Sequence, residues 1–107
     1  MPRVREPARH ERPDIDEAAL TAARAADRLL ESARERGAER WIRLLEPVPD
    51  KLRDAGFGEL RSVAVRVRAV YGPRDSIRDA LPADRTEPFL AELDRLLKVL
   101  AREAAAR

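Results

Sequence analysis

The side chains that could act as catalysts are few and lie apart in this sequence. The single histidine, His10, stands between Arg9 and Glu11 in a proline-containing segment without a periodic apolar face. A Ser/His/Asp triad needs its histidine held rigidly, so we expect no hydrolytic centre here. The chain has no cysteine, which excludes a thiolate nucleophile and a cysteine-based zinc site.

Paired carboxylates could supply a general acid and a general base, or they could bind a metal ion. The closest sets are Asp14, Asp16 and Glu17, and then Asp75 and Asp79. The first set is better explained as the start of a helix, with Asp14 and Glu17 forming a capping box. The second set alternates with Arg74 and Arg78, so these charges can neutralise one another. We therefore predict no catalytic residues, no metal site, no cofactor and no enzyme activity.

The least ordinary feature is a run of arginines without acids. Between Leu60 and Arg74 there are four arginines and no aspartate or glutamate. Guanidinium groups bind phosphates and carboxylates through paired hydrogen bonds, so these side chains are candidates for binding an anionic partner. With one further arginine, the candidate set is Arg61, Arg66, Arg68, Arg74 and Arg78. Alternatively, acids on neighbouring helices balance these charges, or the arginines extend over the core.

The net charge of +2 arises entirely in the first 13 residues, which hold four arginines and two glutamates. This segment also contains three prolines and lacks an apolar face, as flexible segments do. The rest of the chain carries 18 basic and 18 acidic residues, so the pI near 9.6 does not mark a basic domain. We predict a flexible N-terminal arm over residues 1–13 and a single helical domain over residues 14–107.

Apolar residues recur at steps of three or four from Ile15 onward, which predicts an amphipathic helix. Its apolar stripe is mostly alanine and continues in phase through Gly37. We therefore predict one helix over residues 14–46, ended by Pro47 and Pro49. The alternative is a break at Gly37, a residue typical of helix ends, that divides two collinear helices.

The valine-rich segment 59–71 fits two kinds of secondary structure. Val63, Val65 and Val67 alternate with other residues as in a strand, while the helical period also places most apolar residues on one face. A lone strand has nothing to pair with, and no second strand-like run occurs in the sequence. We predict a helix.

Shorter elements and a last helix complete the predicted fold. A helical turn is expected over residues 50–55, a loop over residues 56–58 and a short helix that opens at Pro73. The last helix is rich in leucine and has Pro88 in its first turn. The predicted class is all-α: a small helical bundle with a long Ala-rich N-terminal helix, a Val-rich middle helix, short connecting helices and a Leu-rich C-terminal helix.

These helices point to binding rather than to catalysis. A long helix lined by alanine either packs tightly on its neighbours or leaves a face for another chain. We predict a non-enzymatic helical interaction module that self-associates or serves as a small subunit of a protein complex. The alternative is a protein that binds phosphate or nucleic acid through the Arg-rich segment 61–78 and the basic arm.

Insertion into a membrane is not expected. No apolar run approaches the roughly 18 residues that a membrane span needs, and the first residues show no apolar core of a signal peptide. We expect a cytoplasmic protein without a cofactor. Its expected partner is another protein or a second copy of the chain, with nucleic acid as the alternative partner.

Overall fold

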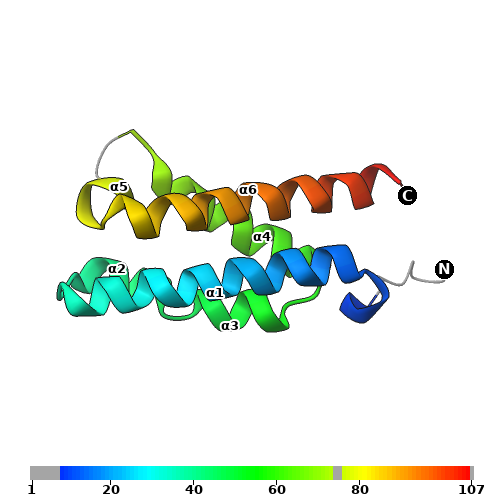
Figure 1. Cartoon of the computed structure of the whole chain (residues 1–107). Helices are drawn as coiled ribbons and strands as arrows, with labels where there is room; N and C mark the ends of the chain where they lie inside the picture. The colour runs from blue at the N-terminus through cyan, green and yellow to red at the C-terminus, as the bar shows by residue number, and fades with distance from the viewer. Residues whose placement is uncertain (1–7, 74–75, 107) are drawn as a thin grey trace.

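The computed structural model describes residues 8–73 and 76–106. In chain order the elements are η1 (Arg9–Glu11), α1 (Pro13–Glu35), α2 (Glu39–Leu45), α3 (Val48–Asp54), α4 (Phe57–Arg68), η2 (Ala69–Tyr71), α5 (Ile77–Ala80) and α6 (Ala83–Ala105). The longer helices form a bundle of antiparallel segments, which are α1, α2 with α3, α4 and α6 (Figure 1). Neither described range contains a strand, which confirms the predicted all-α bundle. Within these ranges, no helix combines the length and the apolar character needed to cross a bilayer.

The helices pack as a closed ring of four segments. α1 lies against α6 along most of its length, and α6 in turn packs on α4 (Figure 1). α4 contacts α3, and the consecutive helices α2 and α3 both pack back on α1. Because successive segments alternate in direction, the two ends of the described chain lie at the same end of the molecule (Figure 1).

The alanine stripe of α1 is enclosed by the other helices of the same chain. Seven alanines of this helix are buried: Ala18, Ala19, Ala22, Ala23, Ala25, Ala26 and Ala33. They face α6, α3 and α2, which surround α1 on several sides. Small side chains let helix axes approach closely, but each buried alanine contributes little hydrophobic free energy. The stripe therefore packs on its neighbours and leaves no alanine-lined face for another chain.

The prediction of one helix over residues 14–46 is wrong, because the chain turns back at Gly37. Gly37 adopts a φ of +63°, the left-handed conformation that favours glycine. The amide of Ala38 donates to the carbonyl of Ala33 at 3.0 Å, and the amide of Gly37 donates to the carbonyl of Arg34 at 3.1 Å. This pair of bonds is a Schellman motif. The two helices are not collinear either, since α2 packs against α1.

Gly37→Ala is expected to lower the free energy of unfolding by about 1 kcal/mol, because an L residue with a side chain is strained at this φ. A Cβ at this position would meet nothing within 4 Å, so backbone strain alone accounts for the loss. Urea denaturation measures the effect. Asparagine tolerates the left-handed conformation better than alanine, so Gly37→Asn should cost less. An alanine variant as stable as the wild type would contradict this account of the turn.

The valine-rich segment forms a helix, as predicted, and its burial pattern shows why. Val63 and Val67 are buried with 4% and 6% of their surface exposed, whereas Val65 between them is 52% exposed. A strand would place all three on the same face, while the helical period separates the middle one. The predicted loop over residues 56–58 is wrong, because Phe57 already begins α4.

Several helix starts differ from the prediction for local reasons. The capping box of Asp14 and Glu17 does not form, because α1 begins at Pro13 and Arg12 takes the N-cap position in place of Asp14. Ser76 and Asp79 form a capping box instead, so the short helix begins at Ile77 and not at Pro73. α6 begins at Ala83, which places Pro88 in the second turn and not in the first.

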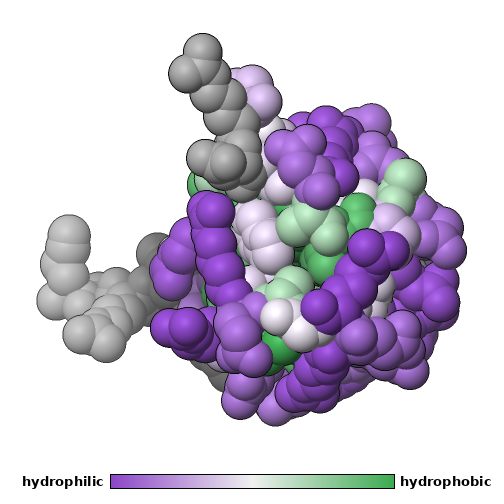
Figure 2. All heavy atoms as spheres, turned by 90° about the vertical axis from the view of Figure 1, so that its left-hand side faces the viewer, coloured by the Kyte–Doolittle hydropathy of each residue, from purple (hydrophilic) through white to green (hydrophobic). Residues whose placement is uncertain are grey.

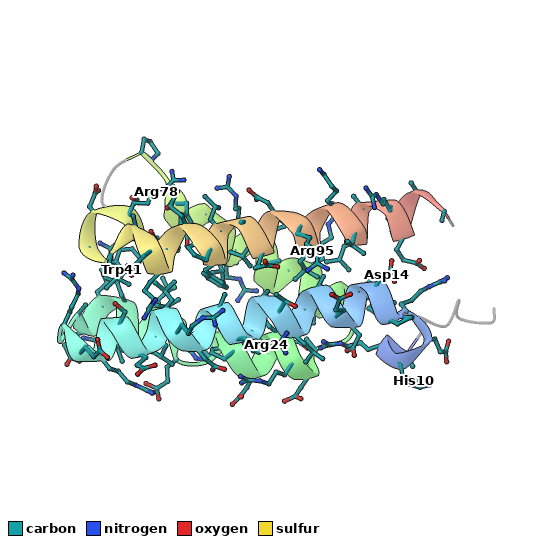
Figure 3. The ribbon with its side chains drawn as sticks, in the orientation of Figure 1. His10, Asp14, Arg24, Trp41, Arg78 and Arg95 are labelled. Carbon is teal, nitrogen blue, oxygen red and sulfur yellow. The ribbon has the colours of Figure 1, made fainter. Side chains whose placement is uncertain are left out.

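The end of the bundle with the α1–α2 turn and α5 is closed by apolar side chains. Figure 2 looks onto this end and shows apolar residues gathered at its centre with hydrophilic residues around them. Trp41, the only tryptophan, lies at this end (Figure 3) and is buried. The guanidinium carbon of Arg40 lies 4.7 Å from the centroid of its ring. Contacts of this kind stabilise by about 0.5–1 kcal/mol at exposed sites.

Candidate interaction site

The five arginines of the predicted anionic-partner set do not form one patch among the described residues. Arg61, Arg66 and Arg68 lie on α4, and Arg78 lies on α5, while Arg74 lies outside the described residues. Arg61 has no ion-pair partner in the described part of the chain, and Arg66 donates only to the hydroxyl of Ser62 at 3.2 Å. Five residues on a helix separate Arg61 from Arg66 and turn them to different faces.

The other two described arginines of this set are paired with carboxylates of α6. The Nε of Arg68 donates to Asp94 at 2.7 Å. Arg78 forms a two-point contact with Glu87, through Nε at 3.0 Å and Nη2 at 2.8 Å. The alternative that acids on neighbouring helices balance the arginines therefore describes Arg68 and Arg78.

The pair of Arg78 and Glu87 belongs to a polar cluster that joins η2, α5 and α6. The hydroxyl of Tyr71 donates to the carbonyl oxygen of Thr86 at 2.5 Å, and the guanidinium of Arg78 lies 5.5 Å from the centroid of the Tyr71 ring. The hydroxyl of Thr86 donates to Glu87 at 3.0 Å. This cluster holds the first turns of α6 on η2, so its role is structural.

Hydrogen bonding and burial shift the pKa values of Glu87, Arg78 and Tyr71 in this cluster. The contact with Arg78 lowers the pKa of Glu87, and the same contact raises the pKa of Arg78. Burial is the main cause that raises the pKa of Tyr71, and the charge of Glu87 adds to it. Because the pKa of Glu87 is lowered, the stability that this pair provides is present above the ordinary glutamate pKa and is lost as the pH falls through the lowered value.

Tyr71 is the only tyrosine, so its ionisation can be followed by absorbance without overlap. We expect the phenol of the folded protein to stay neutral well above pH 10. A tyrosine in the unfolded chain ionises near pH 10. The free energy of unfolding should therefore fall above pH 10, by up to about 1.4 kcal/mol per pH unit. Urea denaturation at several alkaline pH values tests this. The Tyr71→Phe variant should lose this part of the pH dependence, and an ordinary absorbance titration would contradict the prediction.

The residues considered for catalysis are dispersed over the molecule. His10 is exposed on η1 at one end of the bundle, and Arg78 lies at the opposite end (Figure 3). Asp16 accepts from the Nε of Arg9 at 3.0 Å, and Glu17 pairs with Arg95 at 3.3 Å. In residues 8–73 and 76–106, no three histidine or acidic side chains are placed to hold a metal ion. Asp75 lies outside these ranges.

A groove with mostly apolar walls runs between α4 and the α2–α3 segment. Its volume is about 220 Å³, and the residues that line it are Leu44, Pro47, Val48, Lys51, Val63, Arg66, Val67 and Val70. Leu44 and Val70 are only half-buried. The charged members, Lys51 and Arg66, are exposed, and neither contacts an acid of the described residues. The groove therefore offers an apolar floor with two available cations at its sides.

The size of the groove favours side chains of a polypeptide over an enclosed small molecule. Ligand pockets usually measure about 300–1,000 Å³ and surround most of the ligand, whereas this groove is smaller and opens along one side of the bundle. The sequence predicts only one wall of the groove, because the helical period of segment 59–71 places most of its apolar residues on one face. The opposite wall, formed by Leu44, Pro47 and Val48, could not be predicted. A single helix over residues 14–46 would not bring these residues back beside the valines.

Comparisons with family models, with curated proteins and with solved structures found no match to this chain.

Proposed function

We propose that this protein is a non-enzymatic helical interaction module, which acts by holding a surface of another polypeptide chain in the groove between α4 and the α2–α3 segment. Either a second copy or the larger subunit of a complex would supply that surface. The observation that supports the proposal is the groove itself, with apolar walls from three helices and the half-exposed side chains of Leu44 and Val70 at its opening. Interfaces between proteins commonly combine such an apolar centre with a polar edge.

The other parts of the molecule agree with a binding role. The polar cluster described above joins η2, α5 and α6, and Asp16 and Glu17 form ion pairs with arginines. The alanine stripe of α1 is covered from within the chain, so it is not the docking surface in this proposal. A cytoplasmic location stays a prediction from the sequence.

A photo-reactive amino acid placed at Lys51 tests the proposal directly. Lys51 lines the groove, is exposed and has no ion-pair partner among the described residues, so its replacement should leave the fold intact. On irradiation, both as the purified chain and in an extract of the producing cells, we expect a covalent adduct with a second polypeptide.

A matched control uses the same photo-reactive residue at Arg34. Arg34 is exposed on α1, away from the groove lining. The adduct should form from position 51 and not from position 34, and it should be suppressed by Val70→Asp, which places a charge at the groove opening. If position 51 yields no adduct, or if Val70→Asp leaves the adduct unchanged, the proposal is wrong.

Binding of phosphate or nucleic acid is the second candidate function. The observation that favours it is that Arg61 and Arg66 are exposed and have no acid partner among the described residues. The ion pairs of Arg68 and Arg78 weigh against it. Binding of this kind must weaken steeply as salt is raised, and Arg61→Ala with Arg66→Ala must reduce that slope. No retention of DNA or RNA at low salt would end this candidate.

A further inference from the structure

The groove continues into a second hollow of opposite charge at the α3–α4 turn. This hollow has a volume of about 240 Å³, and its lining residues are Asp50, Lys51, Asp54, Ala55 and Glu59. Lys51 belongs to both hollows, so they form one continuous face. Asp54 and Glu59 are exposed and pair with no cation of the described residues, while Asp50 is already paired with Arg53. One end of the face is therefore acidic, and the other carries Arg66.

The two ends of this face are related by a helical repeat. Glu59 and Arg66 are seven residues apart on α4, which places them on the same side of the helix about 10 Å apart along its axis. Val63 lies between them and Val70 follows, at the spacing of residues that form one stripe of a helix. This side of α4 thus carries an acid, a valine and a base from its N-terminal end, and Val70 of η2 continues it.

From this pattern we infer that the face binds a second copy of the same chain, with the two α4 helices antiparallel across a two-fold axis near Ser62 and Val63. In a two-fold interface each residue pair occurs twice. The Glu59 carboxylate of each copy then lies beside the Arg66 guanidinium of the other, and the exposed Ser62 side chains of the two copies lie between the two ion pairs, close to the axis. This inference deepens the proposed function by naming the partner of the groove.

The charge pattern favours a second copy over an acidic peptide. A uniformly acidic segment would be attracted to Lys51 and Arg66 but repelled by Asp54 and Glu59 at the other end of the same face. Only a partner with its own charges in the reverse order satisfies both ends, and an antiparallel copy has that order. The bundle measures 49 × 24 × 24 Å, so one side of it can supply the roughly 800 Å² per partner of a standard interface.

Sedimentation equilibrium of the full chain from about 1 to 300 µM tests the inference, with the expected result of a reversible dimer. Arg66→Glu and Glu59→Arg should each weaken dimerisation at least tenfold, because each places like charges together twice. The double variant should restore the affinity to within about threefold of wild type. The control Arg34→Glu changes an exposed charge of α1 outside this face and should have no effect.

An engineered cross-link provides an independent measurement. The chain has no cysteine, and Ser62 is exposed near the inferred two-fold axis. Ser62→Cys should therefore give a disulfide-linked dimer on mild oxidation, while Arg24→Cys, on the exposed side of α1 (Figure 3), should not.

Three results would overturn the dimer: a wild-type monomer at every concentration, single charge reversals without effect, or a double variant that is not restored. If the wild-type chain stays monomeric while the photo-reactive residue at position 51 joins a different polypeptide, the dimer is wrong and the proposed function stands. If the wild-type chain stays monomeric and the photo-reactive residue at position 51 joins no polypeptide, both the dimer and the proposed function are wrong. Far-UV circular dichroism of each variant verifies that the exposed substitutions leave the helices folded.

Discussion

Arg9→Met is expected to destabilise the protein by about 2–3 kcal/mol, because one buried guanidinium completes the end of a helix. The side chain of Arg9 is only 12% exposed. Its Nη1 donates to the carbonyl oxygens of Leu52 at 2.8 Å, Arg53 at 2.5 Å and Ala55 at 3.3 Å. The last carbonyls of a helix lack partners within the helix, and a cation there also interacts favourably with the helix dipole.

The size of this effect follows from what the substitution leaves behind. Methionine fills a similar volume but donates no hydrogen bond, so the carbonyls at the end of α3 lose a charged donor. Hydrogen bonds to charged groups contribute about 1.5–3 kcal/mol each, and a buried acceptor left alone costs about 1–3 kcal/mol. The carboxylate of Asp16 loses its partner as well.

Urea denaturation of Arg9→Met beside Arg24→Met measures the loss. Arg24 is exposed and donates only to the hydroxyl of Thr21, so its replacement should change the free energy of unfolding by no more than about 0.5 kcal/mol. Equal effects of the two substitutions would show that the contact between η1 and α3 does not stabilise the fold.

Ala22→Leu is expected to cost about 1–3 kcal/mol, the usual cost of inserting extra methylene groups into a packed core. Ala22 is fully buried, and α1 has α6, α3 and α2 packed around it. A larger side chain can be placed only if α1 moves away from a neighbour. That movement would separate other alanine contacts along the same helix.

The same substitution at Ala91 is the matched control. Ala91 is exposed on α6, and leucine and alanine are both good helix formers, so Ala91→Leu should be close to neutral. Thermal denaturation of the wild type and both variants measures the two effects, and only Ala22→Leu should lower the melting temperature. An Ala22→Leu variant that melts with or above the wild type would show that the centre of the bundle has spare room.

Elements with a strong periodic pattern were predicted from the sequence, and their ends were not. The leucine face of α6 and the valine face of α4 lie in the core, because hydrophobic periodicity over several turns determines which side of a helix is buried. Gly37 was recognised as a signal for a helix end, but the alanine stripe continued through it in phase. The chain turns there because the Schellman motif stabilises the reversal, and the reversal lets α2 pack against α1.

The candidate site depends on contacts between residues far apart in the chain, which the sequence pattern does not reveal. Asp94 lies 26 positions from Arg68, so the neutralisation of that arginine could be offered only as an alternative. Arg9 was placed in a flexible arm, yet its guanidinium binds carbonyls more than 40 positions away. The groove has walls from α2, α3 and α4. It could not be predicted from the sequence, because the chain reversal at Gly37 brings these walls together.

The antiparallel contact between α1 and α6 determines when this chain can fold during its synthesis. α1 leaves the ribosome before α6, but its alanine face gains little from burial, and isolated helices are marginal in water. The helix that covers it along most of its length, α6, is translated only after α2, α3, α4 and α5. During synthesis α1 must therefore wait until α6 has been made before it finds this partner, and its alanine face is open to proteases and chaperones until then.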